Sequence, residues 1–424
     1  MGITRTSASQ PDLGAALDKC PYIRHNPPNP DPNCMEVIIH TTSPKAPLAG
    51  MLVVEMGHSV AAPFAGQILG DLGAEVIKIE KPEGDDARKW GPPFVDGAAA
   101  TYQALNRNKK SVVTRLRDAA DRERLIALIE RADVVLQNLR PGQVEQLGLG
   151  ADEMLQRNSR LVYCNMGAFG ARGPLAGHPG YDPLMQAFSG IMSVVGMEGA
   201  PSVRVGPSII DMGTGMWGVI GILSALMRRQ ATGAGSVVDV SLFETATAWM
   251  TMHAAQYLAS GELPTKVGSG QVGIVPYRAY RTSDGELVVA AGNDKLFKGF
   301  CAAMGRLEWV TDARFASNPE RVRHADALYP LIEAEMARRN NADWLALLEA
   351  EGVPCAPVQN ARQMLEHEQT LALGIAQPVP DSSIPLIGLP ISFDGQRPVP
   401  RYAARPLGAD TAMLASEPVT IDPA

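Results

Sequence analysis

Asp182 is the residue whose surroundings most suggest chemistry. It follows Pro179-Gly180-Tyr181 and precedes Pro183, and an apolar stretch runs on to Phe188. Asp followed by Pro is a common helix start, with the carboxylate at the N-cap and the proline at N1. A helix N-terminus also stabilises negative charge, which keeps a carboxylate in the ionised form that a nucleophile needs. Asp182 is therefore a candidate helix cap, a candidate nucleophile, or both.

Other residues leave a structural and a functional interpretation open. Asp211 and Glu244 fall in apolar surroundings, where a carboxylate is either paired or functional. His178, shortly before Asp182, is either a general base or a solvent-facing loop residue. The glycine-rich run Gly268–Gly273 is either a flexible connection or a lid that closes over a reactive intermediate.

Basic and amide side chains gather in two short runs, 106–111 (NRNKKS) and 138–142 (NLRPG). Each is either a solvated turn or part of a phosphate-binding sheet edge. The run 57–62 (GHSVAA) follows an expected strand but lacks the three-glycine spacing of a dinucleotide fingerprint. Walker A, zinc and Gly-x-Ser-x-Gly patterns do not occur in the sequence, so we predict no metal site.

A parallel sheet is needed to bring these residues together. Residues 52–56 and 75–80 are predicted strands separated by an apolar helix, which is a βαβ unit. More strands are predicted at 111–113, 132–136, 160–164 and 236–241, and a hairpin with an Asp-Gly turn at 277–291. We expect an α/β fold, with a Rossmann-like doubly wound large domain and a smaller α+β domain. The expected divisions are an irregular extension (1–45), the large domain (46–230), the small domain (231–340) and a C-terminal segment (341–424).

Composition narrows the class of protein. The 424 residues carry a net charge of −7, which argues against nucleic-acid binding. We found no apolar run near the ~20 residues that span a bilayer, and no signal peptide, so we expect a cytoplasmic protein without membrane partners. The five scattered cysteines are typical of reduced thiols. Cys20 and Cys34 leave a disulfide, or a metal site with His25, as an alternative.

Ordered blocks of sequence occur between about residue 50 and residue 408: 53–56, 65–80, 84–85, 106–111, 132–135, 138–142, 179–190 and 221–226. They resemble the family III CoA-transferases (CaiB/BaiF family), which include formyl-CoA transferase and carnitine CoA-transferase, and the related α-methylacyl-CoA racemases. The chain departs from the family pattern in its long start, in Gln137-Asn138-Leu139-Arg140 where Glu-Asn-Phe-Arg is usual, and in lacking a histidine near 408–411.

The resemblance implies an interlocked homodimer whose C-terminal segment returns to the large domain; a hetero-oligomer with a sister subunit is the alternative. It implies that Asp182 is the catalytic aspartate and that Gly268 and Gly270 belong to a glycine loop over the active site. It implies no tightly bound cofactor, with CoA and acyl-CoA as substrates. The implied CoA contacts are His58, Ser59, Val60, Ala61, Lys81, Asn108, Lys109, Asn138, Leu139, Arg140, Met166, Gly167, Ala168 and Phe169.

The reaction implied is CoA transfer from an acyl-CoA, with succinyl-CoA as a candidate, to a free carboxylic acid through an aspartyl anhydride and an aspartyl-CoA thioester. An α-methylacyl-CoA racemase is the main alternative, but residues 59–177 contain no histidine to pair with Asp182. A catalytically silent CoA-binding subunit is another alternative. Arg88, Arg107 and Arg204 are candidates to bind a second carboxylate of the substrate.

Overall fold

The computed structural model describes residues 46–414. The expected extension at 1–45, with Cys20, Cys34 and His25, lies outside the described residues. The described chain has the predicted α/β architecture, with one six-stranded sheet and three smaller antiparallel sheets.

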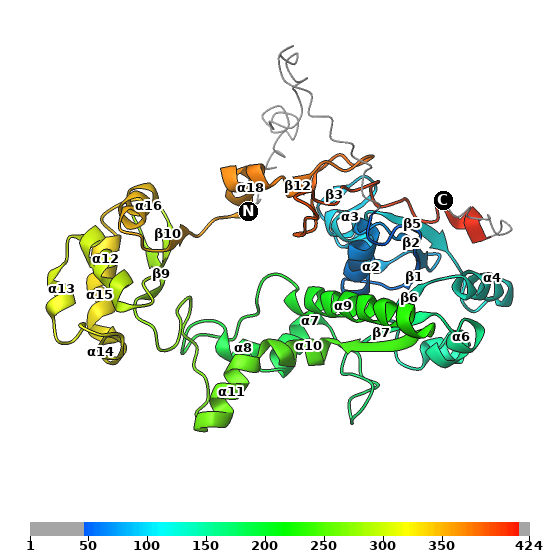
Figure 1. Ribbon diagram of the computed structural model, residues 1–424, viewed down its shortest axis with the longest axis horizontal. Coiled ribbons are helices and arrows are strands. Elements are labelled where there is room, and N and C mark those ends of the chain that lie inside the picture. The colour runs from blue at the N-terminus through cyan, green and yellow to red at the C-terminus, as the bar shows by residue number, and fades with distance from the viewer. Residues whose placement is uncertain (1–45, 415–424) are drawn as a thin grey trace, which may run out of the picture. The chain divides into compact units, whose positions relative to one another are not determined.

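The large sheet is parallel throughout (Figure 1). Its strands are β1 (Leu52–Met56), β2 (Glu75–Glu80), β5 (Lys109–Val113), β6 (Val134–Gln137), β7 (Val162–Gly167) and β8 (Ser236–Ser241), in the spatial order β5-β2-β1-β6-β7-β8. This is the doubly wound order of dinucleotide-binding folds, and it reverses between β1 and β6. Ligands of such folds bind outside the carboxyl ends of the strands at that reversal.

The expected boundary at residue 230 falls too early. β8 lies beyond it, yet β8 pairs with β7 in parallel and so completes the large sheet. The loops and the apolar helix between β7 and β8 form a long crossover connection, which a parallel pair of strands requires. The local pattern indicated the strand but not its partner, because pairing between strands so far apart leaves no local signal.

Helices cover both faces of the large sheet. Helices α2 (Ala61–Asp71) and α9 (Ile209–Thr232) share one apolar core, and α4 (Ala119–Glu130) and α6 (Ala151–Arg157) share another. α2 and α9 approach so closely that a Cβ on Gly215 would stand 2.8 Å from the carbonyl oxygen of Ala61. Glycine at that position therefore allows the two helices to pack.

α9 corrects the expectation that no apolar stretch reaches membrane-spanning length. Its 24 residues are long and apolar enough to cross a bilayer by length and composition alone. However, 50% of its most apolar window is buried inside the protein, and core helices of globular domains pass the same test. We therefore describe α9 as a core helix of the large domain.

A third apolar core belongs to the hairpin region. The predicted hairpin is confirmed as β9 (Tyr277–Arg281) and β10 (Glu286–Ala290), and β11 (Cys355–Pro357) pairs with β10. Around it pack α12 (Asp294–Met304), α13 (Glu308–Thr311), α14 (Asn318–Arg323), α15 (Ala325–Met336) and α16 (Asn341–Ala350). The other elements are η1 (Asp86–Lys89), β3 (Phe94–Val95), β4 (Ala98–Ala99), α3 (Ala100–Asn106), α5 (Gln143–Gln146), α7 (Asp182–Phe188), α8 (Ile191–Val194), α10 (Leu242–Trp249), α11 (Thr251–Ser260), α17 (Ala361–Glu366), α18 (Glu368–Leu373), β12 (Ala376–Gln377), β13 (Leu386–Ile387) and η2 (Thr411–Leu414).

Residues 401–411 lie along the outer edge of β5. The backbone N–H of Asn108 donates to the carbonyl of Tyr402 at 3.1 Å. The N–H of Ser111 donates to the carboxylate of Asp410 at 2.9 Å. This segment therefore satisfies backbone groups that an open edge strand would leave unpaired.

Candidate active site

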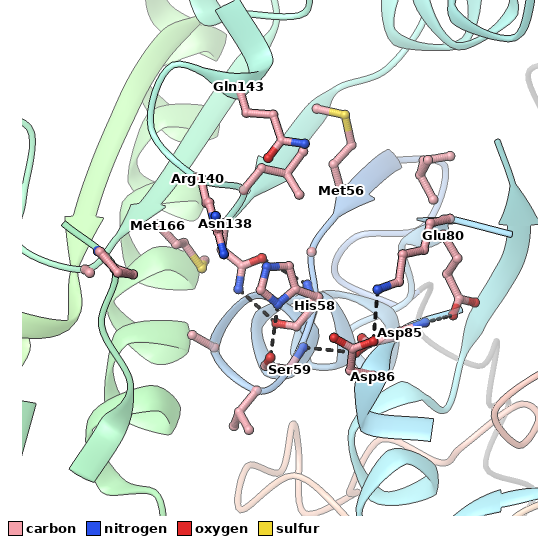
Figure 2. Close-up of a pocket in the computed structure, with 18 of the residues that line it drawn as sticks. Met56, His58, Ser59, Glu80, Asp85, Asp86, Asn138, Arg140, Gln143 and Met166 are labelled. Atoms are coloured by element: carbon pink, nitrogen blue, oxygen red, sulfur yellow. Dashed lines mark hydrogen bonds and ion pairs between the residues drawn. The ribbon is translucent and has the colours of Figure 1, made fainter. Parts of the chain in front are cut away.

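A cavity of about 890 Å³ opens where the order of the large sheet reverses. Its walls come from the segments that follow β1, β2, β5, β6 and β7, together with the loop before α7 and the first turn of α9. The position and size are those of a cofactor- or substrate-binding cleft in a doubly wound fold. Figure 2 shows part of the wall, with Met56, His58, Asn138 and Met166 around the opening.

The turn after β1 forms one side of this cavity. Asn138 holds it from β6: the N–H of His58 donates to the Asn138 Oδ1 at 2.9 Å, and the Asn138 Nδ2 donates to the carbonyl of His58 at 2.9 Å. Ser59 has a left-handed backbone with φ of 67°. A non-glycine residue adopts this conformation only when its surroundings impose it. Figure 2 shows Asn138 on one side of the turn and Asp85 on the other.

A buried ionic network lies beneath the turn. The Lys78 Nζ is 2.9 Å from Glu55, 3.0 Å from Asp85 and 2.7 Å from the carbonyl of Gly57. Burial opposes the charged form of Lys78, but the carboxylates of Glu55 and Asp85 raise its pKa above the ordinary value. Burial also opposes ionisation of Asp85, but Lys78 and the Ala87 N–H lower its pKa. The network is therefore ionic at neutral pH.

The imidazole of His58 faces the cavity. Its Nδ1 lies 3.0 Å from the Ser59 hydroxyl. Partial desolvation by the surrounding walls lowers the pKa of His58, and the charge of Asp85 opposes this only in part. The ring is therefore neutral at neutral pH and can exchange hydrogen bonds with a polar ligand.

Four basic side chains stand around the cavity: Lys81, Arg115, Arg117 and Arg140. Lys81 forms an exposed ion pair with Asp86 at 2.9 Å. In the described part of the chain, the side chains of Arg117 and Arg140 have no ion-pair partner. Sequence reasoning missed Arg115 and Arg117, although two arginines just past the end of β5 were a readable signal. A cavity with these cations suits a ligand that carries phosphates.

Asp182 lies inside the protein and is not part of the cavity wall. Its side chain is 2% exposed. Its Oδ1 accepts from the Gln186 Nε2 at 2.6 Å, and its Oδ2 accepts from the N–H groups of Ile210 at 2.8 Å and Asp211 at 3.2 Å. The expected N-cap role is wrong for its own helix, because Tyr181 is the N-cap and Asp182 is the first residue of α7. Asp182 instead caps the N-terminus of α9, which has no side-chain cap of its own from Ser208.

Asp211 does line the cavity. It lies in the first turn of α9, directly beside Asp182, and is half-buried. Burial raises the pKa of Asp211 to about 7, and the negative charge of Asp182 adds to the effect. A desolvated, basic carboxylate at a cavity wall is able to act as a nucleophile or as an acid–base group. The signal in the sequence was its position as an acid among apolar residues.

Most of the predicted CoA contacts meet in the cavity. Those that line it are His58, Ser59, Val60, Ala61, Lys81, Asn138, Leu139, Arg140, Met166, Gly167 and Ala168. They come from segments widely separated in the sequence. The sheet joins them because the carboxyl ends of parallel strands meet at one edge.

Asn108 and Lys109 are placed elsewhere. The Asn108 amide is 0% exposed and bonds to Asp71 at 2.7 Å and to the N–H of Arg401 at 2.7 Å. The Lys109 Nζ is buried 2.8 Å from Glu55, and burial lowers the pKa of Lys109 to about 8. Both side chains are occupied by internal contacts, so the structure does not support CoA contacts for them.

Three other predicted residues also lie outside the cavity wall. Phe169 packs among aromatic rings, 5.4 Å from Phe188 and 6.0 Å from Phe243 between ring centroids. Gly268 donates its N–H to the carbonyl of Gly196, and Gly270 donates to that of Val267. Their prediction as a glycine loop over the active site stays a prediction.

The remaining candidates mostly have structural partners. Arg88 pairs with Glu80 at 2.7 Å and Arg107 with Asp71 at 2.6 Å, both at buried carboxylates. Arg204 is exposed and donates to nearby carbonyls. None of these arginines lines the cavity. Glu244 bonds to the Ser241 hydroxyl at the start of α10, whereas the exposed His178 does line the cavity.

Comparisons with known proteins give the same picture over nearly the whole described chain. A profile of CoA-transferase family III matches residues 48–411. The chain is 35% identical to an acetyl-CoA:oxalate CoA-transferase of Acetobacter aceti, over 88% of this chain and 96% of the relative. It is 34% identical to a succinate–glutarate CoA-transferase of Agrobacterium fabrum, over 89% of this chain and 97% of the relative.

Solved structures agree with these sequence matches. A CaiB/BaiF family protein from Brucella suis superposes with a TM-score of 0.81 at 36% identity, over 88% of this chain and 99% of that chain. Rv3272 from Mycobacterium tuberculosis gives a TM-score of 0.78 at 29% identity, over 88% and 99% of the two chains. Fold, cavity and relatives together show that the chain is a transferase enzyme that belongs to CoA-transferase family III.

Proposed function

We propose that this enzyme moves CoA from an acyl-CoA donor to a free carboxylic acid, with Asp211 as the group that carries the acyl and CoA intermediates. The observation that carries the proposal is the placement of Asp211. It is the aspartate of the Asp182–Asp211 pair that lines the cavity, together with most of the predicted CoA contacts. The relatives named above transfer CoA between carboxylic acids, which supports the reaction class.

The catalytic role that the sequence resemblance implies for Asp182 stays a prediction, and we prefer its neighbour Asp211 for a physical reason. A nucleophile must reach the thioester carbon, and Asp182 is buried with both oxygens engaged by N–H donors. Those donors stabilise its negative charge and reduce its reactivity. Asp211 is half-buried and lines the cavity. Burial also makes the Asp211 carboxylate more basic, and a more basic carboxylate is the stronger nucleophile.

The reaction balances without a metal or redox partner. A carboxylate oxygen of Asp211 attacks the donor thioester carbon, the C–S bond breaks, and CoA leaves as the thiolate from a mixed anhydride. The thiolate then attacks the aspartyl carbon, which releases the donor acid and leaves an aspartyl-CoA thioester. The acceptor carboxylate attacks this thioester, the C–S bond breaks, and the CoA thiolate is released as a second anhydride forms. The thiolate attacks the acyl carbon of the acceptor, giving the new acyl-CoA and free Asp211.

The substrates we propose are succinyl-CoA as the donor and a short dicarboxylic acid as the acceptor. The names of the relatives support both choices. The arginines suggested for a second carboxylate do not support it, because Arg88 and Arg107 already neutralise internal acids. Two of the four basic side chains at the cavity, Lys81 and Arg140, are themselves predicted CoA contacts.

We propose that the working form is an interlocked homodimer. The sequence resemblance motivates this, and the apolar surface of the single chain supports it. α9 and the helices beside it expose Met212, Met216, Trp217, Ile220, Met227, Trp249 and Met252. In this proposal a second copy covers the apolar surface. The glycine loop at 268–273 would then lie close to an active site of the dimer. The cytoplasm is the location we propose for this enzyme, because its substrates are CoA thioesters.

Mass spectrometry tests the proposed reaction. The enzyme is incubated with succinyl-CoA and a panel of free acids, and new thioesters are identified. We expect CoA transfer to at least one dicarboxylate. If no acid accepts CoA and a chiral 2-methylacyl-CoA loses its configuration, the racemase alternative replaces this proposal. If no CoA compound binds or reacts, the transferase proposal fails altogether.

Trapping identifies the nucleophile. Hydroxylamine added during turnover converts an activated aspartyl group to a hydroxamate, which peptide mapping locates. We expect modification at Asp211. The variant Asp211→Ala should show no modification and no transfer, whereas Asp182→Ala should still be modified at Asp211 at a reduced rate. A hydroxamate on Asp182 would return the role to that residue.

A further inference from the structure

We propose that Lys78 and Asp85 are positioning residues for catalysis, because they hold the turn at residues 57–59 in the shape that the CoA cavity requires. Neither residue was a candidate in the sequence, and the proposal rests on the proposed function in that the cavity must bind a CoA thioester. The juxtaposition that carries it is a buried ion pair in direct contact with the backbone of a cavity-lining turn.

Lys78 contacts the turn at the carbonyl of Gly57. Its side chain extends from β2, is 1% exposed, and donates to the carbonyl of Gly57 at 2.7 Å. The same Nζ lies 2.9 Å from Glu55 and 3.0 Å from Asp85. One ammonium group therefore satisfies the first carbonyl of the turn and binds the two acids at its sides.

Asp85 connects the other end of the turn to Lys78. Its Oδ2 faces Lys78, and its Oδ1 accepts from the N–H of Ser59 at 3.2 Å and from that of Ala87 at 3.0 Å. Figure 2 shows Asp85 facing Ser59. Asp85 is 4% exposed, so water does not replace these bonds readily.

The backbone of Ser59 shows what the network accomplishes. Its φ of 67° is unfavourable for a residue with a side chain, and the turn keeps it while lining the cavity. The turn is also tightly packed at Gly57, because a Cβ there would stand 2.6 Å from the Cβ of Ala62. Without the bonds from Lys78 and Asp85, Ser59 would relax toward negative φ and move the start of α2, where Val60 and Ala61 also line the cavity.

A buried ion pair can also be merely structural, and a second buried pair, between Asp71 at the end of α2 and Arg107, offers a matched control. Asp71 is buried, 2.6 Å from Arg107 and 2.7 Å from the Asn108 amide. It carries the same charge as Asp85 but contacts no residue of the turn. Replacing each aspartate in the same way separates loss of a buried ion pair from loss of the turn.

The test compares Asp85→Asn and Asp85→Ala with Asp71→Asn and Asp71→Ala in the full-length enzyme. CoA affinity is measured by calorimetry, and kcat and KM are measured with the acyl-CoA that the wild type uses. We expect the Asp85 variants to weaken CoA binding and raise KM for acyl-CoA by about tenfold or more, because small displacements of positioning groups have large effects. The Asp71 variants should lose thermal stability with little change in KM. Asn at position 85 keeps an acceptor for Ser59 and should be the milder change.

A glycine at position 59 separates a positioning role of Asp85 from a purely structural one, because only a positioning defect should be rescued by it. Ser59→Gly introduced into Asp85→Ala should restore much of the KM, because glycine adopts positive φ without support. Equal changes in KM for the Asp85 and Asp71 variants, or failure of Ser59→Gly to restore binding, would overturn the inference. A wild-type enzyme that binds no CoA would instead remove the proposed function on which the inference rests.

Discussion

Two aspartates in direct contact divide the work at the proposed site. Asp182 is buried and accepts three hydrogen bonds, whereas Asp211 faces the cavity and has a pKa raised to about 7, by burial first and by Asp182 second. The Asp182 carboxylate thus holds the first turn of α9 in place and makes its neighbour more basic. The first role is one of orientation and the second is electrostatic.

The pH dependence of transfer should follow Asp211. Only the ionised carboxylate attacks a thioester, so activity should rise as the pH increases from about 6 to about 8, through the raised pKa of about 7. Asp182→Asn removes the neighbouring charge and should move this limb to lower pH. The exposed Asp152→Asn serves as the control and should leave the limb unmoved. kcat/KM profiles measure both effects, and an unchanged limb in Asp182→Asn would contradict the electrostatic role.

The raised pKa of Asp211 should also make the stability of the fold depend on pH, with lower stability at high pH where activity is highest. The pKa of Asp211 is raised from its ordinary value to about 7 in the folded state, so the free energy of unfolding falls as the pH rises from about 4 to about 7, and the full cost remains above pH 7. Asp211→Asn should therefore raise Tm at about pH 8, by roughly 1 °C for ~1 kcal/mol after solvent screening. Near pH 4 the gain should vanish. A Tm gain of the same size at both pH values would point to packing rather than charge.

Among the elements, the contact between α2 and α9 has the strictest geometry. Gly215 leaves no space for a Cβ, because one would stand 2.8 Å from the backbone oxygen of Ala61. Gly215→Ala should destabilise the fold by roughly 1–3 kcal/mol, since a backbone atom cannot yield as a side chain can. Chemical denaturation measures the change. Gly177→Ala, which meets no atom within 4 Å, is the control and should stay near the wild type.

The sequence predicted the strands of the large sheet well, but it did not show which distant segments of the chain contact one another. Alternating βαβ patterns located the strands of the large sheet, and their order followed from the fold class. The pattern could not show that β8 pairs with β7, or that residues 401–411 lie along β5, because those contacts join distant segments. For the same reason the local motif around Asp182 was more conspicuous than Asp211. Burial decides which of the two lines the cavity, and burial is a property of the folded chain.

At the scale of the whole molecule, the exposed apolar face is the feature that needs a partner. Trp217, Ile220 and Met216 stand on the same surface of α9, with exposed fractions of 41%, 50% and 48%. Isolated apolar residues at a surface are ordinary, but a continuous group marks an interface.

Charge on this face should prevent assembly. Ile220→Glu would place a carboxylate in the proposed interface, and we expect a dimer of wild type and a monomer of the variant. Light scattering after size exclusion gives the mass of each. Val399→Glu, at an exposed position on the C-terminal segment, is the control. A monomeric wild type would remove the interlocked-dimer proposal.

The segment that closes the edge of β5 has a consequence for the order in which the molecule is made. The backbone N–H of Ser111 donates to the carboxylate of Asp410, which lies 299 residues later in the chain and is therefore made much later. During synthesis, the strands of the sheet can pair long before the ribosome reaches residues 401–411. Until then the β5 edge is an open template for other strands. The nascent protein is thus exposed to aggregation at this edge until residues 401–411 have emerged, and that segment then covers it.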